Sequence, residues 1–175
     1  MSEKSPAAFV GLGVMGYPMA GHLSAMGHPM RVYNRTFSKS AQWVQEHGSD
    51  RSASTHPTPA EAAEGADYVM TCVGNDDDLR SVVLGENGVF AGMMEGAVLI
   101  DHTTTSAVVA RELANEAEKR GLGFLDAPVS GGQAGAESGV LTIMVGGDVV
   151  TFDEAESVMK CYGKTVMRMG DAGAG

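Results

Sequence analysis

Three glycines near the N-terminus have the type and spacing that binding a pyrophosphate requires. Gly11, Gly13 and Gly16 follow the apolar run Ala7–Val10 and open a stretch of helical character, Gly16–Met26. Glycines at this spacing permit a tight turn, let the backbone approach a pyrophosphate and let the helix pack on the strand. The predicted dinucleotide-binding loop comprises Gly11, Leu12, Gly13, Val14, Met15 and Gly16. The alternative is a glycine-rich turn that binds no ligand.

The end of the second predicted strand, Met30–Tyr33, discriminates between NAD and NADP. Proteins that bind NAD usually place Asp or Glu there, to accept hydrogen bonds from the ribose 2′-OH. This chain has Asn34-Arg35-Thr36 instead, followed by Lys39. Because a guanidinium can bind a 2′-phosphate with two hydrogen bonds, we predict NADP in preference to NAD. The alternative is that Arg35 and Lys39 are solvated surface charges.

A second turn that could bind an anion follows a later strand, Phe124–Val129. Ser130-Gly131-Gly132 combines a hydroxyl with two adjacent glycines, whose backbone N–H groups can form an anion-binding nest. Open α/β sheets bind ligands at the carboxyl ends of their strands, so we expect this turn on the same edge as the first glycine loop. An ordinary loop without a ligand is the alternative.

Other polar residues near strand ends have simpler interpretations. His102 could act as a general base, but a lone histidine in this position is more often a hydrogen-bonded structural residue. Asp76–Asp78 cannot converge on one ion, and three acidic residues suit the first turn of a helix. Cys72, at the end of an apolar run, is interpreted as a buried thiol. With Cys161 as the only other cysteine, we predict neither a disulfide framework nor a metal site.

The elements that must position these residues alternate between strands and helices. Apolar runs of strand length, many without polar alternation, suit a parallel sheet that is covered on both faces. They are Ala7–Val10, Met30–Tyr33, Tyr68–Val73, Ala97–Ile100, Phe124–Val129, Leu141–Val145 and Thr165–Met169. The predicted helices are Gly16–Met26, one opened by a capping box at Thr58–Glu61, Ser106–Arg120 and Asp153–Tyr162. This order predicts a single doubly wound α/β domain of Rossmann type, with a mostly parallel sheet.

Charge and composition restrict the partners. The chain has 175 residues and a net charge of −10, so nucleic acids and anionic membranes are poor candidate partners. The N-terminal 45 residues nevertheless carry a net charge of +3, where the nucleotide is expected. No secretory signal and no membrane-spanning run are recognisable, so we expect a cytoplasmic protein.

Four segments together resemble the β-hydroxyacid dehydrogenase family, which includes 3-hydroxyisobutyrate dehydrogenase. They are Phe9–Ala20, Val32–Thr36 with Lys39, Ile100–Thr104 and the sequence DAPVSGG at Asp126–Gly132. The resemblance implies that Ser130, Gly131 and Gly132 bind the substrate carboxylate. The implied cofactor contacts are Gly11 through Gly16, Asn34, Arg35, Thr36, Lys39, Val73, Gly74 and Thr104. Asp78 departs from the family, where some members have an asparagine, and we assign it no role.

The resemblance also implies what the chain does not contain. In the family, the catalytic lysine and an all-helical domain follow a glycine-rich segment similar to Gly170–Gly175, and none of the lysines here matches that position. We therefore expect residues 1–169 to be the NADP-binding domain, and residues 170–175 to be the start of a flexible connection leading away from it.

The function implied is hydride transfer between NADP(H) and a β-hydroxy acid or its semialdehyde, by an oxidoreductase that forms a homodimer or tetramer. We expect these 175 residues alone to be inactive. A 6-phosphogluconate dehydrogenase or imine reductase relative, a methyl-donor-binding protein, and a non-catalytic nucleotide-binding or scaffold module are alternatives.

Overall fold

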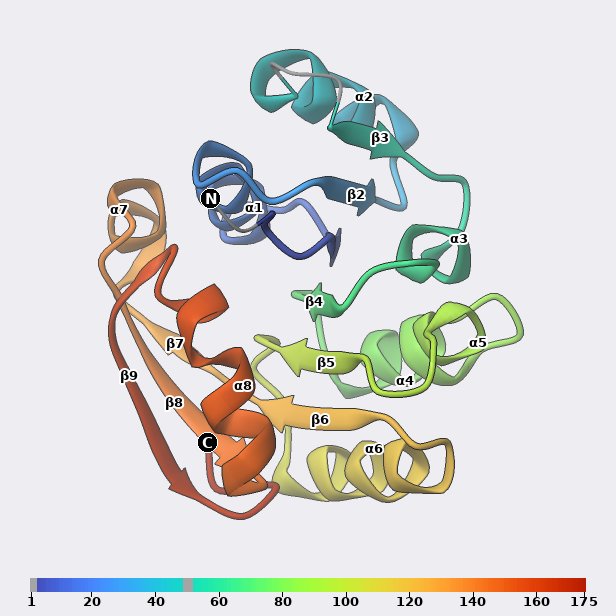
Figure 1. Cartoon of the computed structure of the whole chain (residues 1–175), viewed down its shortest axis with the longest axis vertical. Helices are drawn as coiled ribbons and strands as arrows, with labels where there is room; N and C mark the ends of the chain where they lie inside the picture. The colour runs from blue at the N-terminus through green and yellow to red at the C-terminus, as the bar shows by residue number, and fades with distance from the viewer. Residues whose placement is uncertain (1–2, 49–51) are drawn as a thin grey trace.

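The computed structural model describes residues 3–48 and 52–175 and contains one central sheet (Figure 1). Six parallel strands lie in the order β3 (Ala53–Thr55), β2 (Met30–Tyr33), β1 (Ala7–Val10), β4 (Tyr68–Thr71), β5 (Val98–Asp101) and β6 (Gly123–Asp126). This order confirms the predicted doubly wound fold. The chain turns from one half of the sheet to the other between β1 and β4, which opens a crevice at the carboxyl ends of these strands.

The far end of the sheet is mixed rather than parallel. Strand β7 (Val129–Ser130) continues β6 in the same antiparallel register against β8 (Leu141–Gly147), and β9 (Gly163–Gly170) runs parallel to the other edge of β8. Pro128 lies between β6 and β7, and its carbonyl still accepts a hydrogen bond from the Met144 N–H at 3.1 Å. Ser130 is therefore held by the sheet itself, at the last paired position of this line of strands.

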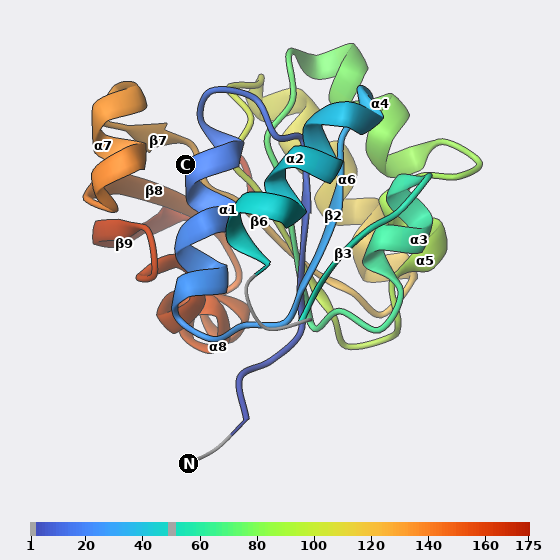
Figure 2. The same cartoon turned by 90° about the horizontal axis from the view of Figure 1, so that it is seen from above.

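Helices cover both faces of the sheet (Figure 2). On one face, α1 (Gly16–Ala25), α2 (Phe37–His47), α7 (Gly132–Ser138) and α8 (Val149–Met159) contribute to one apolar cluster. On the other, α3 (Pro59–Ala63), α4 (Asp76–Leu84), α5 (Val89–Gly92) and α6 (Ala107–Lys119) contribute to a second. Because each face is covered, the strands between them can be apolar on both sides. Among the helices of the described ranges, none is long and apolar enough to cross a membrane.

The predicted helix starts are largely confirmed by their caps. The Thr58 hydroxyl accepts the N–H of Glu61, and the Ser106 hydroxyl accepts that of Val109. Asp76–Asp78 form the first turn of α4, as expected. The start of α8 was predicted wrongly at Asp153. The Asp148 carboxylate accepts the N–H groups of Val150 and Thr151, so the helix begins at Val149.

The glycine-rich end of the chain also differs from the expectation. Gly170 is the last residue of β9, and the residues after it fold back instead of leading away. The N–H groups of Gly173 and Gly175 donate to the two carboxylate oxygens of Asp126, at 2.8 and 2.9 Å. Small residues were interpreted as flexible, but here their size is what permits close packing. Strand β3 and helices α2, α5 and α7 were not predicted. Strand β3 and helices α5 and α7 are short, and α2 is polar on most of its surface.

Candidate functional site

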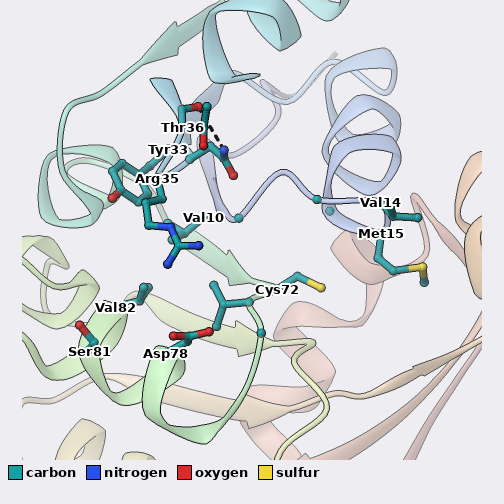
Figure 3. A pocket seen from close by; sticks show the side chains of 16 residues that line it. Val10, Val14, Met15, Tyr33, Arg35, Thr36, Cys72, Asp78, Ser81 and Val82 are labelled. Carbon is teal, nitrogen blue, oxygen red and sulfur yellow. Dashed lines mark hydrogen bonds between the residues drawn. The ribbon is translucent and has the colours of Figure 1, made fainter. Parts of the chain in front are cut away.

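A cavity of about 560 Å³ lies at the carboxyl ends of β1, β2 and β4, in the crevice that the strand order creates (Figure 3). It is lined by Val10, Gly11, Gly13, Val14, Met15, Gly16, Tyr33, Asn34, Arg35, Thr36, Cys72, Val73, Gly74, Asp78, Ser81 and Val82. Most of the predicted cofactor contacts are therefore brought together. Leu12, Lys39 and Thr104 are the predicted contacts that do not line this cavity.

The three glycines of the first loop have three different reasons to be glycine. Gly11 has φ +100°, and a β-carbon there would collide with the backbone carbonyl of Cys72. A β-carbon at Gly16 would collide with the carbonyl of Gly11, because the start of α1 packs directly on the loop. A β-carbon at Gly13 would meet no atom within 4 Å. Gly13 is exposed and lines the cavity, so its open side leaves room for a pyrophosphate to approach the backbone.

The first turn of α1 supports the same interpretation. Within the described part of the chain, no side chain caps α1 at Met15 or α2 at Thr36, and both helices begin at the cavity. By contrast, α4, α6 and α8 are capped by Asn75, Ser106 and Asp148. The uncapped N–H groups at the start of α1 suit a phosphate ligand, because the helix dipole also favours negative charge there.

Asn34 connects the end of β2 to the glycine loop. Its Oδ1 accepts the N–H of Leu12 at 2.9 Å, and its Nδ2 donates to the carbonyl of Thr36 at 3.1 Å. The Leu12 side chain is buried in the core, so this residue contributes a backbone anchor to the site. Asn34 therefore lines the cavity while holding the loop in place.

Arg35 places a positive charge in the cavity. Its guanidinium extends from the end of β2 into the space between the glycine loop and α4, as Figure 3 shows. Asp78 and Ser81 of α4 line the opposite wall. Lys39 lies elsewhere: its ammonium is 5.8 Å from the centre of the Tyr17 ring, on the α1–α2 side.

The wall that follows β4 is fixed by hydrogen bonds to the next loop. Val73 and Gly74 line the cavity, and the Val73 N–H donates to Thr103 Oγ1 at 3.0 Å. Thr104, one residue further, is exposed. Burial raises the pKa of the Cys72 thiol to about 12, and the nearby Asp101 adds to the shift. Cys72 is therefore a thiol at neutral pH and a poor nucleophile.

Both ring nitrogens of His102 have hydrogen-bond partners within the fold. Its Nδ1 lies 2.7 Å from the Ala127 carbonyl and its Nε2 2.6 Å from the Tyr162 hydroxyl. Because a carbonyl only accepts, Nδ1 carries the proton, and the Tyr162 hydroxyl donates to Nε2. Complete burial lowers the pKa of His102 to about 4. These contacts favour the structural role over a general base.

The neighbouring Asp101 is a buried carboxyl group. Burial raises its pKa to about 6, although hydrogen bonds from Thr103 and Thr71 oppose the shift and Asp126 adds to it. Oδ1 accepts from the Thr71 hydroxyl and from the Thr103 N–H, whereas Oδ2 has no partner among the described residues. Asp101 thus organises the loop that supports Val73. Within residues 3–48 and 52–175, no group of three or more His, Cys, Asp or Glu could hold a metal ion.

The second glycine turn lies on a different part of the sheet. Ser130, Gly131 and Gly132 are exposed, and the two glycines have φ of +134° and +62°. None of the three lines the 560 Å³ cavity. The turn leads into α7, which packs beside α1.

His22, which the sequence did not single out, connects the helices of the two turns. From α1, its Nε2 lies 2.9 Å and 3.0 Å from the carbonyls of Ala136 and Glu137 at the end of α7. No local pattern indicates a contact between residues 114 positions apart in the chain.

Comparison with known proteins gives a consistent result. Residues 6–170 match the family described as the NAD binding domain of 6-phosphogluconate dehydrogenase. The chain is 56% identical to an "uncharacterized oxidoreductase" of Shewanella frigidimarina, over 96% of this chain and 56% of that protein. It is 40% identical to mouse mitochondrial 3-hydroxyisobutyrate dehydrogenase, over 100% of this chain and 51% of that protein.

A solved structure gives the same picture. The Mycobacterium tuberculosis 3-hydroxyisobutyrate dehydrogenase with L-serine superposes with a TM-score of 0.89 at 32% identity, over 98% of this chain and 56% of that one. The chain thus spans about half the length of the relatives it matches.

Proposed function

Because the chain belongs to the family of the NAD binding domain of 6-phosphogluconate dehydrogenase, we propose that it binds NADP(H) for an oxidoreductase acting on a β-hydroxy acid or its semialdehyde. The observation that carries the proposal is the cavity at the sheet crevice, with the open side of Gly13 and the uncapped start of α1 facing it. A dinucleotide fits these residues, with the pyrophosphate at Gly13–Gly16 and the adenosine ribose toward Arg35.

The preference for NADP rests on Arg35. No carboxylate follows β2, where NAD-binding proteins usually have one, and the Arg35 guanidinium faces into the cavity. A guanidinium can donate two hydrogen bonds to a 2′-phosphate. Asp78, on the opposite wall, acts against this preference, because a carboxylate accepts hydrogen bonds from ribose hydroxyls but repels a phosphate. The attraction of Arg35 for the 2′-phosphate therefore has to exceed the repulsion by Asp78.

The test is a fluorescence titration of the chain with NADPH and NADH, repeated with Arg35→Ala. Loss of the charged hydrogen bonds is expected to weaken NADPH binding roughly 10- to 100-fold and to change NADH binding by less than about threefold. Lys39→Ala is the matched control, since it removes a nearby positive charge outside the cavity. Equal affinity of the unmodified chain for both nucleotides would contradict the assignment of Arg35. A loss with Lys39→Ala as large as with Arg35→Ala would assign the phosphate to both cations.

The substrate side of the proposal depends on the second turn. The backbone N–H groups of Gly131 and Gly132 and the Ser130 hydroxyl are exposed at the end of β7, and such a turn can hold a carboxylate. When NADP(H) is bound, its nicotinamide accepts or supplies the hydride. The acid/base group is proposed to be a lysine in the remaining part of a protein of the relatives' length, which also forms the homodimer or tetramer. Free Cys72 and Cys161 suit a reducing compartment such as the cytosol.

Because the proposed acid/base lysine is not among these residues, we expect the chain alone to be inactive. Incubation with NADP⁺ and 3-hydroxyisobutyrate is expected to give no increase in NADPH absorbance, while nucleotide binding remains measurable. The reason is that neither candidate can exchange a proton near neutral pH. Burial lowers the pKa of His102 to about 4, so it binds a proton too weakly, and raises the pKa of Cys72 to about 12, so it stays protonated. Turnover by the chain alone would show that an acid/base group lies among its own residues.

A further inference from the structure

Asp126 is an acidic residue whose side chain is almost completely buried, with 6% of its surface exposed. Its two carboxylate oxygens accept hydrogen bonds from the backbone, Oδ1 from Gly173 at 2.8 Å and Oδ2 from Gly175 at 2.9 Å. The two donors lie 47 and 49 residues away along the chain. Burying a carboxylate is costly unless it is hydrogen-bonded, so these N–H groups and the carboxylate require each other.

The carboxylate is closely packed on the side that faces β8. A β-carbon at Gly146, on the neighbouring strand β8, would lie 2.6 and 2.7 Å from the Asp126 oxygens and 2.8 Å from the Ala174 nitrogen. Gly173 has φ +95°, a conformation that favours glycine. A β-carbon at Gly173 would lie 3.2 to 3.4 Å from atoms of Arg111 and Ala107 on α6, and one at Gly175 would lie 2.7 Å from Asp126 Oδ2. Close packing therefore explains both glycines.

The start of the segment is fixed independently. The Arg168 guanidinium on β9 donates to the Gly147 carbonyl at 2.7 Å and to the Asp171 carboxylate at 3.0 Å. Residues 171–175 are thus held at both ends, by Arg168 and by Asp126. A small cavity of about 210 Å³ lies beside them, lined partly by Thr103, Ser106 and Pro128.

The position of Asp126 relates this segment to the second glycine turn. Asp126 ends β6 and Ser130 ends β7, and both pair with β8 in one continuous antiparallel register. One stretch of five residues therefore carries both the exposed serine and the buried carboxylate. Any displacement of this stretch would move the turn and residues 171–175 together.

We propose that Asp126 is a positioning residue, which fixes the backbone of residues 171–175 beside the carboxyl ends of β5 and β6 in a constant relation to Ser130. In a protein of the relatives' length, the chain after Gly175 would then start from a fixed point and direction. The consequence for catalysis rests on the proposed function: the segment would set where the acid/base group stands relative to the substrate carboxylate.

The test uses the chain itself, without nucleotide, so its outcome is independent of the proposed function. Through-hydrogen-bond NMR couplings are expected between the Gly173 and Gly175 amide nitrogens and the Asp126 side-chain carboxyl carbon. Asp126→Asn keeps the shape but only one accepting oxygen, and is expected to speed exchange of at least one of the two amides roughly 10- to 100-fold. Asp153→Asn, on the exposed surface of α8, is the matched control and is expected to leave both amides unchanged.

A second variant keeps the test decisive if Asp126→Asn does not fold. Gly146→Ala leaves the Asp126 charge in place but inserts a methyl group between the carboxylate and Ala174, so it is expected to release the same two amides. The β1 and β4 amides report whether the domain remains folded. Absence of the couplings in the unmodified chain, or unchanged exchange of Gly173 and Gly175 in both folded variants, would overturn the proposal.

Discussion

The two glycine turns of the molecule differ in how much of their surroundings the chain supplies. The first turn, Gly11–Gly16, is packed against backbone: β-carbons at Gly11 and Gly16 would collide with carbonyl groups. The second, Ser130–Gly132, is exposed, and a β-carbon at Gly131 would meet mainly the Leu141 side chain, at 3.1 Å. The first turn also forms part of a 560 Å³ cavity, which the second does not line.

This difference indicates that the chain supplies more of the proposed nucleotide site than of the proposed substrate site. Strands β1, β2 and β4 together with α4 surround the first turn, and the residues that line its cavity all lie between Val10 and Val82. The second turn presents backbone N–H groups with only one side covered. A carboxylate there would need further walls, and this fits the proposal that the rest of a longer protein contributes to the substrate site.

The largest effect is expected from adding a methyl group to the first turn. Gly11→Ala combines an unfavourable φ of +100° with a collision at the Cys72 carbonyl, and is expected to lower the free energy of unfolding by about 2–5 kcal/mol and to abolish measurable NADPH binding. The matched control is Gly65→Ala, which has φ +74° but open space around the β-carbon. It is expected to cost about 1–2 kcal/mol with NADPH affinity unchanged. Urea unfolding and NADPH titration measure both; equal costs would show that packing at Cys72 contributes nothing.

The first turn was the part of the site most open to prediction, because its information is local. The spacing of Gly11, Gly13 and Gly16 after an apolar strand defines a geometry in six residues. The sheet of β1, β2, β4, β5 and β6 was predictable for the same reason, since apolar runs mark buried strands. Arg35 followed from its place one residue after Asn34, at the end of β2.

The contacts that were not predicted depend on distant residues. His22 bonds to Ala136, and Gly173 to Asp126, across 114 and 47 residues, and neither contact leaves a local pattern. The C-terminal glycines were interpreted as flexible because composition alone cannot distinguish a mobile segment from one packed too closely for side chains. Lys39 was predicted as a cofactor contact because it follows Arg35 closely in the sequence. Its side chain instead extends from α2 toward the Tyr17 ring.

A pH-dependent effect is expected at Asp101 and His102, at the end of β5. In the folded state His102 stays neutral down to about pH 4, whereas an unfolded histidine is protonated below 6.5. The unfolded chain binds more protons between these values, so this group makes stability fall as pH falls. Asp101 acts in the opposite direction: it keeps its proton up to about pH 6 when folded, against 3.8 when unfolded, so its contribution is lost as pH rises.

The two slopes are therefore expected to oppose each other between about pH 4 and 6. His102→Gln can still donate to the Ala127 carbonyl and accept from Tyr162, but it does not titrate. Relative to the unmodified chain, its free energy of unfolding is expected to fall by about 3 kcal/mol from pH 4 to 6.5, as measured by urea unfolding. Tyr162→Phe is the control: it keeps the imidazole, so stability drops at every pH with the slope retained. Parallel curves for His102→Gln and the unmodified chain would mean that His102 titrates alike in both states.

The smallest effects are expected from a pair of substitutions that compares the open sides of the two turns. A β-carbon at Gly13 or at Gly132 meets no atom within 4 Å, so neither alanine creates a clash within the chain. Gly13→Ala is expected to leave stability within about 0.5 kcal/mol but to weaken NADPH binding roughly tenfold, because the methyl group would occupy the place proposed for the pyrophosphate. Gly132→Ala, at φ +62°, is expected to cost about 1 kcal/mol of stability and leave NADPH affinity within twofold. If Gly132→Ala weakened NADPH binding as much as Gly13→Ala, the two turns would share one ligand, and the separation between a complete nucleotide site and a one-sided substrate turn would be wrong.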